Sequence, residues 1–189
     1  MISAILLAAG ESKRMNGVNK LTKKVNGEPL INHSVKNILE SLVDELIIII
    51  GHKGEEIKNV ININKKIKFI YNNSYKSGMS SSIKIGLDNL SEKTQSFFIC
   101  LGDMPMINKE IYNQLIRHSK IKEIIVPTFK NQQGNPVLFS ISMKDIIMNI
   151  EGDNGAKKIL ETNKDKIFNL EINNQGIFKN YNTLNNFDN

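Results

Sequence analysis

The sequence predicts an α/β fold in which a doubly wound, mostly parallel sheet lies between two layers of helices. Short apolar runs rich in β-branched residues alternate with segments whose apolar residues recur at helical spacing. The 189 residues show no repeat and no linker, so we expect one domain over residues 1–189. With 40% hydrophobic and 23% charged residues, the chain has enough apolar surface to bury a core.

The predicted strands are the continuously apolar runs, because strands covered by helices on both faces have no solvated side. These runs are residues 2–7, 45–50, 67–71, 97–101 and 124–127. The predicted helices cover residues 29–42, 55–63, 80–90 and 109–118, with Pro29 in a first turn and Ile83, Leu87 and Leu90 on one face. Residues 126–139 are typical of strand, turn and strand, two more helices are expected over 144–149 and 155–162, and the tail 173–189 has no predicted element.

The net charge of +6 favours general solvation over nucleic-acid binding. Only Arg14 and Arg117 of the 25 basic residues are arginines, and the lysines are spread along the chain rather than gathered on one stripe. The single Cys100 cannot form an internal disulfide, and the Cys and His residues have no zinc-site spacing. The sequence has no apolar run of membrane length and no basic region before its first apolar run. We expect a cytoplasmic protein that binds neither nucleic acid nor membrane.

The first predicted strand runs into the loop LAAGESKRMNGVNK, residues 7–20. Small residues such as Gly10 let a backbone approach a phosphate, and the backbone N–H groups can then donate to its oxygens. Arg14 can hold a phosphate bidentately, and Lys20 can act as a point charge. The loop matches neither common phosphate-loop fingerprint, so an ordinary loop with solvated charges is the alternative.

The fourth predicted strand ends in LGDMP, which places Asp103 at the same edge of the sheet. A carboxylate beside a phosphate loop is a natural ligand for Mg²⁺, which would bridge phosphate oxygens. Asp103 could instead cap the next helix. Met104 and Pro105, however, separate it from the expected helix start near Asn108.

Three further segments carry weaker signals. In GMSSSI, residues 78–83, hydroxyls at a helix N-terminus could bind an anion, or Ser80 or Ser81 could simply cap the helix. Taken alone, QGNPVLF (133–139) and EGDNGAKKIL (151–160) are typical of structural turns.

Together these segments resemble the MobA-like NTP transferases, which share the loop L-A-[AG]-G-x-S-x-R-M-G and the block G-D-M-P. The resemblance implies a Rossmann-like nucleotidyltransferase fold with three α/β/α layers. It implies catalytic roles for Arg14, Lys20 and Asp103, with Asp103 as the Mg²⁺ ligand. It further implies nucleotide contacts from Leu7, Ala8, Ala9, Gly10, Ser12, Arg14, Lys20, Asn73, Gly78, Ser80, Ser82 and Asp103, and acceptor contacts from Gly134, Asn135, Asp153 and Gly155.

The chain departs from this family at two places. Asn16 stands where glycine is usual, although Gly17 follows directly. In the tail, Asn180, Asn182 and Asn186 stand where the family commonly has aspartates. An amide oxygen can coordinate a metal but brings no negative charge, so a second carboxylate ligand is in doubt.

Within the family, Ala9 in place of a second glycine resembles the cytidylyltransferase branch that acts on the molybdenum cofactor. This implies transfer of CMP from CTP to the terminal phosphate of molybdopterin, release of pyrophosphate, a need for Mg²⁺, and a transient contact with a molybdoenzyme or its chaperone. The alternatives are a guanylyltransferase, a nucleotidyltransferase for another phosphorylated acceptor such as a sugar phosphate, an isoprenoid precursor or phosphocholine, and a catalytically weak carrier of a nucleotide-containing cofactor.

Overall fold

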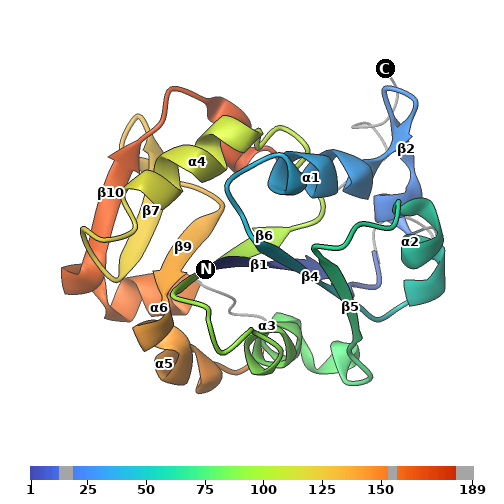
Figure 1. Cartoon of the computed structure of the whole chain (residues 1–189), viewed down its shortest axis with the longest axis horizontal. Coiled ribbons are helices and arrows are strands. Elements are labelled where there is room, and N and C mark those ends of the chain that lie inside the picture. The colour runs from blue at the N-terminus through green and yellow to red at the C-terminus, as the bar shows by residue number, and fades with distance from the viewer. Residues whose placement is uncertain (13–18, 153–156, 182–189) are drawn as a thin grey trace.

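The computed structural model describes residues 1–12, 19–152 and 157–181. Within these residues, eight strands form one mixed sheet in the order β10-β7-β9-β6-β1-β4-β5, with β8 paired to β7 (Figure 1). The strands are β1 (Ile2–Ala8), β4 (Glu45–Ile50), β5 (Ile67–Tyr71), β6 (Ser96–Leu101), β7 (Ile124–Phe129), β8 (Gln132–Gln133), β9 (Val137–Ser140) and β10 (Ile167–Glu171).

The central strands are parallel, as the apolar runs predicted. Strand β1 pairs in parallel with β4 on one side and β6 on the other, and β4 pairs in parallel with β5. Their registers bring Leu7 opposite Leu101 and Ala8 opposite Ile50, so these strands end at one edge of the sheet. Strand β9 runs antiparallel to both β6 and β7, and β10 is parallel to β7. The predicted class, an α/β fold with a mostly parallel sheet, is confirmed.

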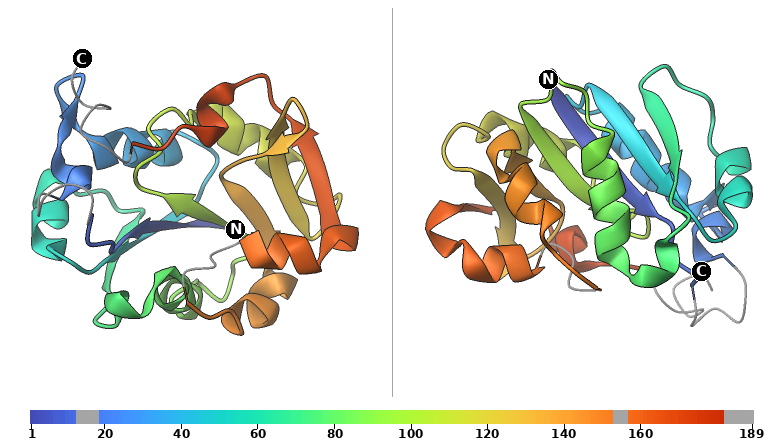
Figure 2. Two further views of the ribbon diagram at one scale, coloured as in Figure 1. Left: turned by 180° about the vertical axis from the view of Figure 1, so that it is seen from behind. Right: turned by 90° about the horizontal axis from the view of Figure 1, so that it is seen from below.

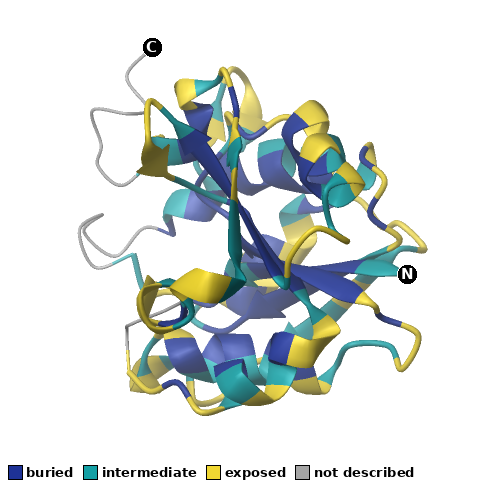
Figure 3. Ribbon diagram, turned by 90° about the vertical axis from the view of Figure 1, so that its left-hand side faces the viewer, coloured by how far each residue is buried: buried dark blue, intermediate teal, exposed yellow. Residues whose placement is uncertain are grey.

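Helices cover both faces of the sheet and bury two cores. The helices are α1 (Leu30–Leu39), α2 (Gly54–Val60), α3 (Met79–Asp88), α4 (Lys109–Arg117), α5 (Lys144–Met148) and α6 (Lys157–Thr162). One core gathers buried residues of α1, α2 and α4, and the other gathers those of α3, α5 and α6 (Figures 1 and 2). Between the two cores, the central strands β1, β4 and β6 are almost completely buried (Figure 3).

Helix α3 lies very close to β1, because Gly86 faces Ile5. A Cβ built on Gly86 would approach Ile5 Cγ2 to 2.4 Å, so this mid-helix glycine allows the close approach that a larger residue would prevent. Ile83 and Leu87 are fully buried beside it. The predicted apolar face is thus correct for these two residues, although α3 ends at Asp88, before Leu90.

Several predicted boundaries were wrong in detail. Helix α1 begins after Pro29, which occupies the N-cap position rather than the first turn, and it ends at Leu39 rather than residue 42. Three strands were not predicted: β10, and the pair β2 (Lys24–Val25) and β3 (Glu28–Pro29), which forms a hairpin. None of the helices in the described part of the chain has the length and hydropathy needed to cross a membrane.

Candidate functional site

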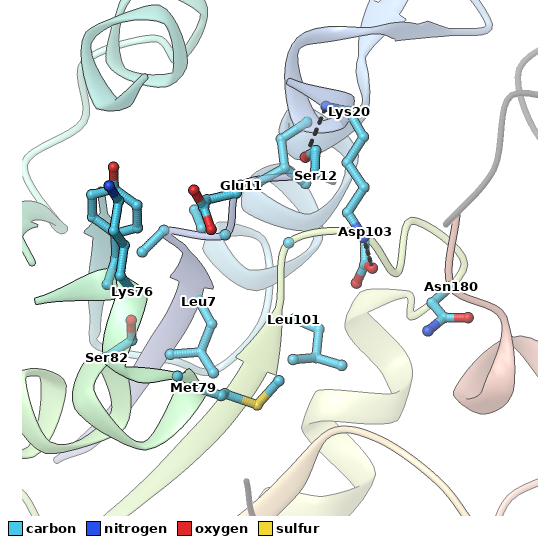
Figure 4. Close-up of a pocket in the computed structure, with 17 residues that line it drawn as sticks. Leu7, Glu11, Ser12, Lys20, Lys76, Met79, Ser82, Leu101, Asp103 and Asn180 are labelled. Atoms are coloured by element: carbon cyan, nitrogen blue, oxygen red, sulfur yellow. Dashed lines mark hydrogen bonds and ion pairs between the residues drawn. The ribbon is translucent and has the colours of Figure 1, made fainter. Parts of the chain in front are cut away.

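A cavity of about 550 Å³ opens at the edge of the sheet where β1, β5 and β6 end (Figure 4). Open parallel sheets bind ligands at this edge, where loops lead from strands into helices. The lining residues are Leu7, Ala8, Ala9, Gly10, Glu11, Ser12, Lys20, Leu21, Tyr75, Lys76, Gly78, Met79, Ser82, Leu101, Gly102, Asp103 and Asn180. Most of the residues to which the sequence assigned nucleotide contacts therefore lie around one cavity.

The loop after β1 forms one wall of the cavity. Ala8 and Ala9 are buried, and the Ala9 carbonyl accepts a hydrogen bond of 3.2 Å from the N–H of His52. A Cβ on Gly51 would come within 2.9 Å of Ala9 Cβ and 3.0 Å of Tyr75 Cβ. The absence of a side chain at Gly51 thus lets the β1 loop and Tyr75 approach each other.

Ser12 joins the two ends of the loop that was predicted to bind phosphate. It has a left-handed backbone with φ of 52°, and its Oγ accepts a hydrogen bond of 3.2 Å from the Lys20 N–H. Asn19 then starts the 3-10 turn η2 (Lys20–Thr22), because its side-chain oxygen accepts from the Leu21 N–H at 3.0 Å. Arg14, Asn16 and Gly17 lie outside the described residues.

The side chains of Lys20 and Asp103 form an ion pair at one end of the cavity (Figure 4). Both side chains are largely shielded, with relative exposures of 19% and 11%. Gly102 holds the strand end close to β1, since its N–H donates to the Leu7 carbonyl at 3.2 Å. The structure therefore brings together the two charged groups that the sequence placed on separate strand ends.

Asp103 is not the cap of the following helix. That position belongs to Asn108, whose side chain accepts a hydrogen bond of 3.2 Å from the Ile111 N–H at the start of α4. The Asp103 carboxylate is instead directed toward Lys20 and the cavity. This excludes the structural alternative that the sequence left open for Asp103.

The C-terminal segment returns to the same place. The Tyr181 N–H donates to the Asp103 carbonyl at 2.9 Å, and Asn180 lines the cavity beside Asp103 (Figure 4). Asn180, which stands where the resembled family commonly has an aspartate, thus brings an amide rather than a carboxylate to the cavity. Asn182 and Asn186 lie outside the described residues.

The start of α3 forms the opposite wall, but only some of its predicted residues face the cavity. Gly78 takes the N-cap position with φ of 98°, so neither Ser80 nor Ser81 caps the helix. Gly78 and Ser82 line the cavity. Ser80 is buried away from it, with its N–H donating to the Gly152 carbonyl at 3.0 Å, and Asn73 is exposed and does not line it.

Of the residues predicted to face the acceptor, the two that the structure describes, Gly134 and Asn135, do not line this cavity. Gly134 packs on the 3-10 turn η6 (Gln175–Phe178), because a Cβ there would approach Ile177 to 2.7 Å. The Asn135 N–H donates to the Ile177 carbonyl at 3.0 Å. Both residues thus support the segment that leads to Asn180. Asp153 and Gly155 lie outside the described residues.

Sequence reasoning missed several residues of the cavity, namely Glu11, Leu21, Tyr75 and Lys76. Tyr75 and Lys76 belong to the 3-10 turn η3 (Tyr75–Ser77) between β5 and α3. No local pattern marks such a turn as part of a site, although its position directly before GMSSSI could have drawn attention to it.

Cys100 is not available as a nucleophile. It is 1% exposed in β6, and burial raises the pKa of its thiol to about 12 despite the opposing hydrogen bond with Tyr112. Because the thiolate is the reactive form, the group is inert near neutral pH. Its interpretation as a small core residue is confirmed.

Comparison with known sequences matches residues 4–167 to the MobA-like NTP transferase domain. The bifunctional protein GlmU of Staphylococcus epidermidis is 28% identical over 134 residues, or 70% of this chain and 29% of that protein. The chain thus spans less than a third of the length of GlmU. A probable molybdenum cofactor guanylyltransferase of Methanosarcina acetivorans is 26% identical over 153 residues, or 79% of this chain and 67% of that protein.

Solved structures with the same fold cover almost the whole chain. A homologue of Rv0371c from Mycobacterium sp. strain JC1 superposes with a TM-score of 0.87 at 20% identity, covering 99% of this chain and 93% of that one. A nucleotidyl transferase from Methanothermobacter superposes with a TM-score of 0.85 at 20% identity, covering 99% of this chain and 94% of that one. At this level of identity the similarity establishes the fold.

Proposed function

Because the chain belongs to the MobA-like NTP transferase family, we propose that it moves a CMP moiety from CTP to a phosphate on an acceptor and releases pyrophosphate. The observation that carries this proposal is the Lys20–Asp103 pair at one end of the cavity. The cavity also has a less charged part, formed by Leu7, Met79 and Ser82 (Figure 4). A nucleotide has the same division into charged phosphates and a flat, weakly polar base.

In the proposed reaction, an oxygen of the acceptor phosphate attacks the α-phosphorus of the nucleotide in line. The bond from the α-phosphorus to the bridging oxygen breaks, and its electron pair leaves with pyrophosphate. No protein nucleophile is needed, so the chain contributes position and charge. The Lys20 ammonium would hold phosphate oxygens and offset the charge that develops on them, and Arg14 would supply a second positive charge.

The donors at Asp103 fit a Mg²⁺ ion that is shared with the triphosphate. Mg²⁺ is commonly held by one or two carboxylates together with substrate phosphates and water. Asp103 supplies one carboxylate, and Asn180 brings an amide to the same cavity. Among the described residues no three His, Cys, Asp or Glu side chains gather as a preformed metal cage. When bound, the ion would supply charge neutralisation of the phosphates.

The choice of CTP rests on Ala9, whose methyl group occupies space that a second glycine would leave open. Ala9 lines the cavity and is 4% exposed. Less space at this wall favours a pyrimidine over the larger purine. GTP is the second candidate, because the relative from Methanosarcina acetivorans is a probable molybdenum cofactor guanylyltransferase.

For the acceptor we propose the terminal phosphate of molybdopterin. The sequence blocks around Gly78, Asp103, Gly134 and Gly152 support this choice, as does the same archaeal relative. The alternatives are sugar phosphates or phosphocholine. A further candidate is a carrier that binds a nucleotide-containing cofactor without turnover, which Asn180 favours because its amide adds no charge to the metal site.

A screen of each nucleoside triphosphate against each acceptor, with Mg²⁺ present and pyrophosphate measured, tests the proposal. We expect release with CTP and a molybdopterin-bearing acceptor. Release with GTP alone would reject the cytidylyl assignment. Tight nucleotide binding without release of pyrophosphate for any combination of nucleotide and acceptor would reject the enzyme hypothesis and favour the carrier.

A further inference from the structure

Asn72 directly follows β5 and is completely buried, with 0% exposure. Its backbone N–H donates to the Ile50 carbonyl at 2.7 Å, which continues the ladder from β4. Its side chain contacts three serines that surround the turn between β5 and α3. Asn72 therefore cannot reach a ligand itself, but it holds the chain that forms one wall of the cavity.

The orientation of the Asn72 amide follows from one partner. The backbone N–H of Ser74 can only donate, and it lies 2.8 Å from Asn72 Oδ1. The oxygen is thereby assigned to Ser74, so the NH₂ group must face the other two serines. Asn72 Nδ2 lies 2.9 Å from both Ser81 Oγ and Ser82 Oγ, which uses its two protons.

This arrangement fixes the direction in which the two hydroxyl groups donate. Each hydroxyl accepts from Asn72, so its single proton must go elsewhere. Ser81 lies 2.8 Å from the Gly78 carbonyl and donates back into the turn. Ser82 lines the cavity, and within the described residues no protein acceptor is found for its proton. The Ser82 O–H is thus left to donate into the cavity.

We propose that Asn72 is a positioning residue that makes Ser82 a hydrogen-bond donor to the nucleoside part of the bound nucleotide. This inference rests on the proposed function, because it requires a nucleotide in the cavity. Ser82 lies on the wall away from the Lys20–Asp103 pair (Figure 4). Its partner is therefore an acceptor atom of the base or ribose, and pyrophosphate alone would not use it.

The substitution N72D reverses this polarity while keeping the shape of the side chain. Both oxygens of the introduced carboxylate accept, so the Ser74 N–H stays satisfied and the hydroxyls of Ser81 and Ser82 turn to donate inward. Ser82 then presents lone pairs to an acceptor of the ligand. Since an unmatched polar contact in a closed site is costly, we expect CTP to bind roughly tenfold more weakly.

A double-mutant cycle measured by calorimetry separates this role from simple support of the fold. The proteins are the wild type, N72D, S82A and N72D/S82A, each titrated with CTP and, separately, with inorganic pyrophosphate. A second cycle replaces S82A by S81A, because the same amide group donates to both hydroxyls but only Ser82 lines the cavity. A thermal melt of each variant checks that it is folded before its binding is compared.

We expect N72D to weaken CTP binding roughly tenfold when Ser82 is present and less than about twofold in the S82A background, with pyrophosphate binding unchanged. In the S81A background the effect of N72D should persist. An equal loss with and without Ser82, or an equal loss for pyrophosphate, would overturn the inference. If the wild type binds no nucleotide at all, the proposed function itself fails, which is a different outcome from a missing coupling.

Discussion

The ammonium group of Lys20 forms an ion pair with the carboxylate of Asp103, although the two residues lie 83 positions apart in the sequence. Lys20 follows the loop after β1, and Asp103 follows β6, so the pair depends on the parallel pairing of these neighbouring strands. Each charge offsets the desolvation of the other at the shielded end of the cavity. Binding of a triphosphate would give each group a new partner, phosphate oxygens for Lys20 and a metal ion for Asp103.

The substitution D103N should abolish nucleotidyl transfer while leaving the fold intact. The neutral amide is a poor replacement for a metal-binding carboxylate, so we expect a loss of at least about a hundredfold in turnover. Without metal, in the presence of a chelator, D103N should bind CTP at least as tightly as the wild type, because a repulsive charge is removed and Lys20 is released. Pyrophosphate assays and calorimetry measure the two effects. Near-normal turnover in D103N would show that Asp103 is not a required metal ligand.

Activity should depend on the positive charges in the cavity and not on the net charge of the protein. We expect K20A to lower activity by about a hundredfold, since its ammonium lies in the cavity. K66A and K122A remove the same charge at positions outside the lining, where the ammonium groups donate to the carbonyls of Val43 and Asp165. These two variants should retain activity within about twofold. Replacing Arg14 by alanine is expected to lower activity as K20A does. Similar losses of activity in all four variants would show that net charge, rather than local charge in the cavity, is what matters.

The substitution A9G should shift nucleotide preference toward GTP. Loss of the methyl group enlarges the part of the cavity where we place the base. One methyl-sized group changes the discrimination between two substrates by about tenfold. The ratio of kcat/KM for GTP to that for CTP is the quantity to measure. A4G is the matched control, because Ala4 is buried in the same strand and does not line the cavity. This control should lower the stability of the protein without changing the ratio. An unchanged ratio in A9G would show that residue 9 does not determine the choice of base.

Stability should fall at high pH because of Cys100. Burial raises the pKa of its thiol from 9.0 to about 12, so between these values the folded protein retains a proton that the unfolded chain loses. The unfolded state is then favoured as pH rises, by about 1.4 kcal/mol per pH unit for one group. Below about pH 9 the contribution is fully present.

Denaturant titrations at several pH values between 8 and 11 measure this effect in the wild type and in C100A. The variant should show a shallower loss of stability, with a remaining slope from Tyr112, whose pKa burial also raises. Parallel curves for the two proteins would show that the thiol is not the group responsible.

The inner strands could be predicted from sequence, because a strand buried on both faces has a continuous run of apolar residues. In β4, the residues Leu46–Ile50 are buried and apolar, and no polar side interrupts the run. The two charged residues of the site were also predictable, since Lys20 and Asp103 follow such strands. Their direct contact was not, because only the strand order places the ends of β1 and β6 side by side.

The outer elements could not be predicted in the same way. Strand β10 has only partly buried or exposed residues, so its sequence carries no continuous apolar run. The β2–β3 hairpin did have a signal, because Asn26 and Gly27 both take positive φ values and Asn-Gly is a typical hairpin turn. The role of Asn72 was hidden for another reason. Its partners are set by how the turn after β5 folds back, which no spacing in the sequence reveals.

The fate of the α-phosphate tests the central claim most directly. The protein is incubated with Mg²⁺, a molybdopterin-bearing acceptor and CTP labelled on either the α- or the γ-phosphate. The account predicts that the α-label becomes covalently attached to the acceptor, one for each pyrophosphate released, and that the γ-label remains in pyrophosphate. Transfer of the γ-label to the acceptor, or recovery of bound CTP unchanged, would contradict it.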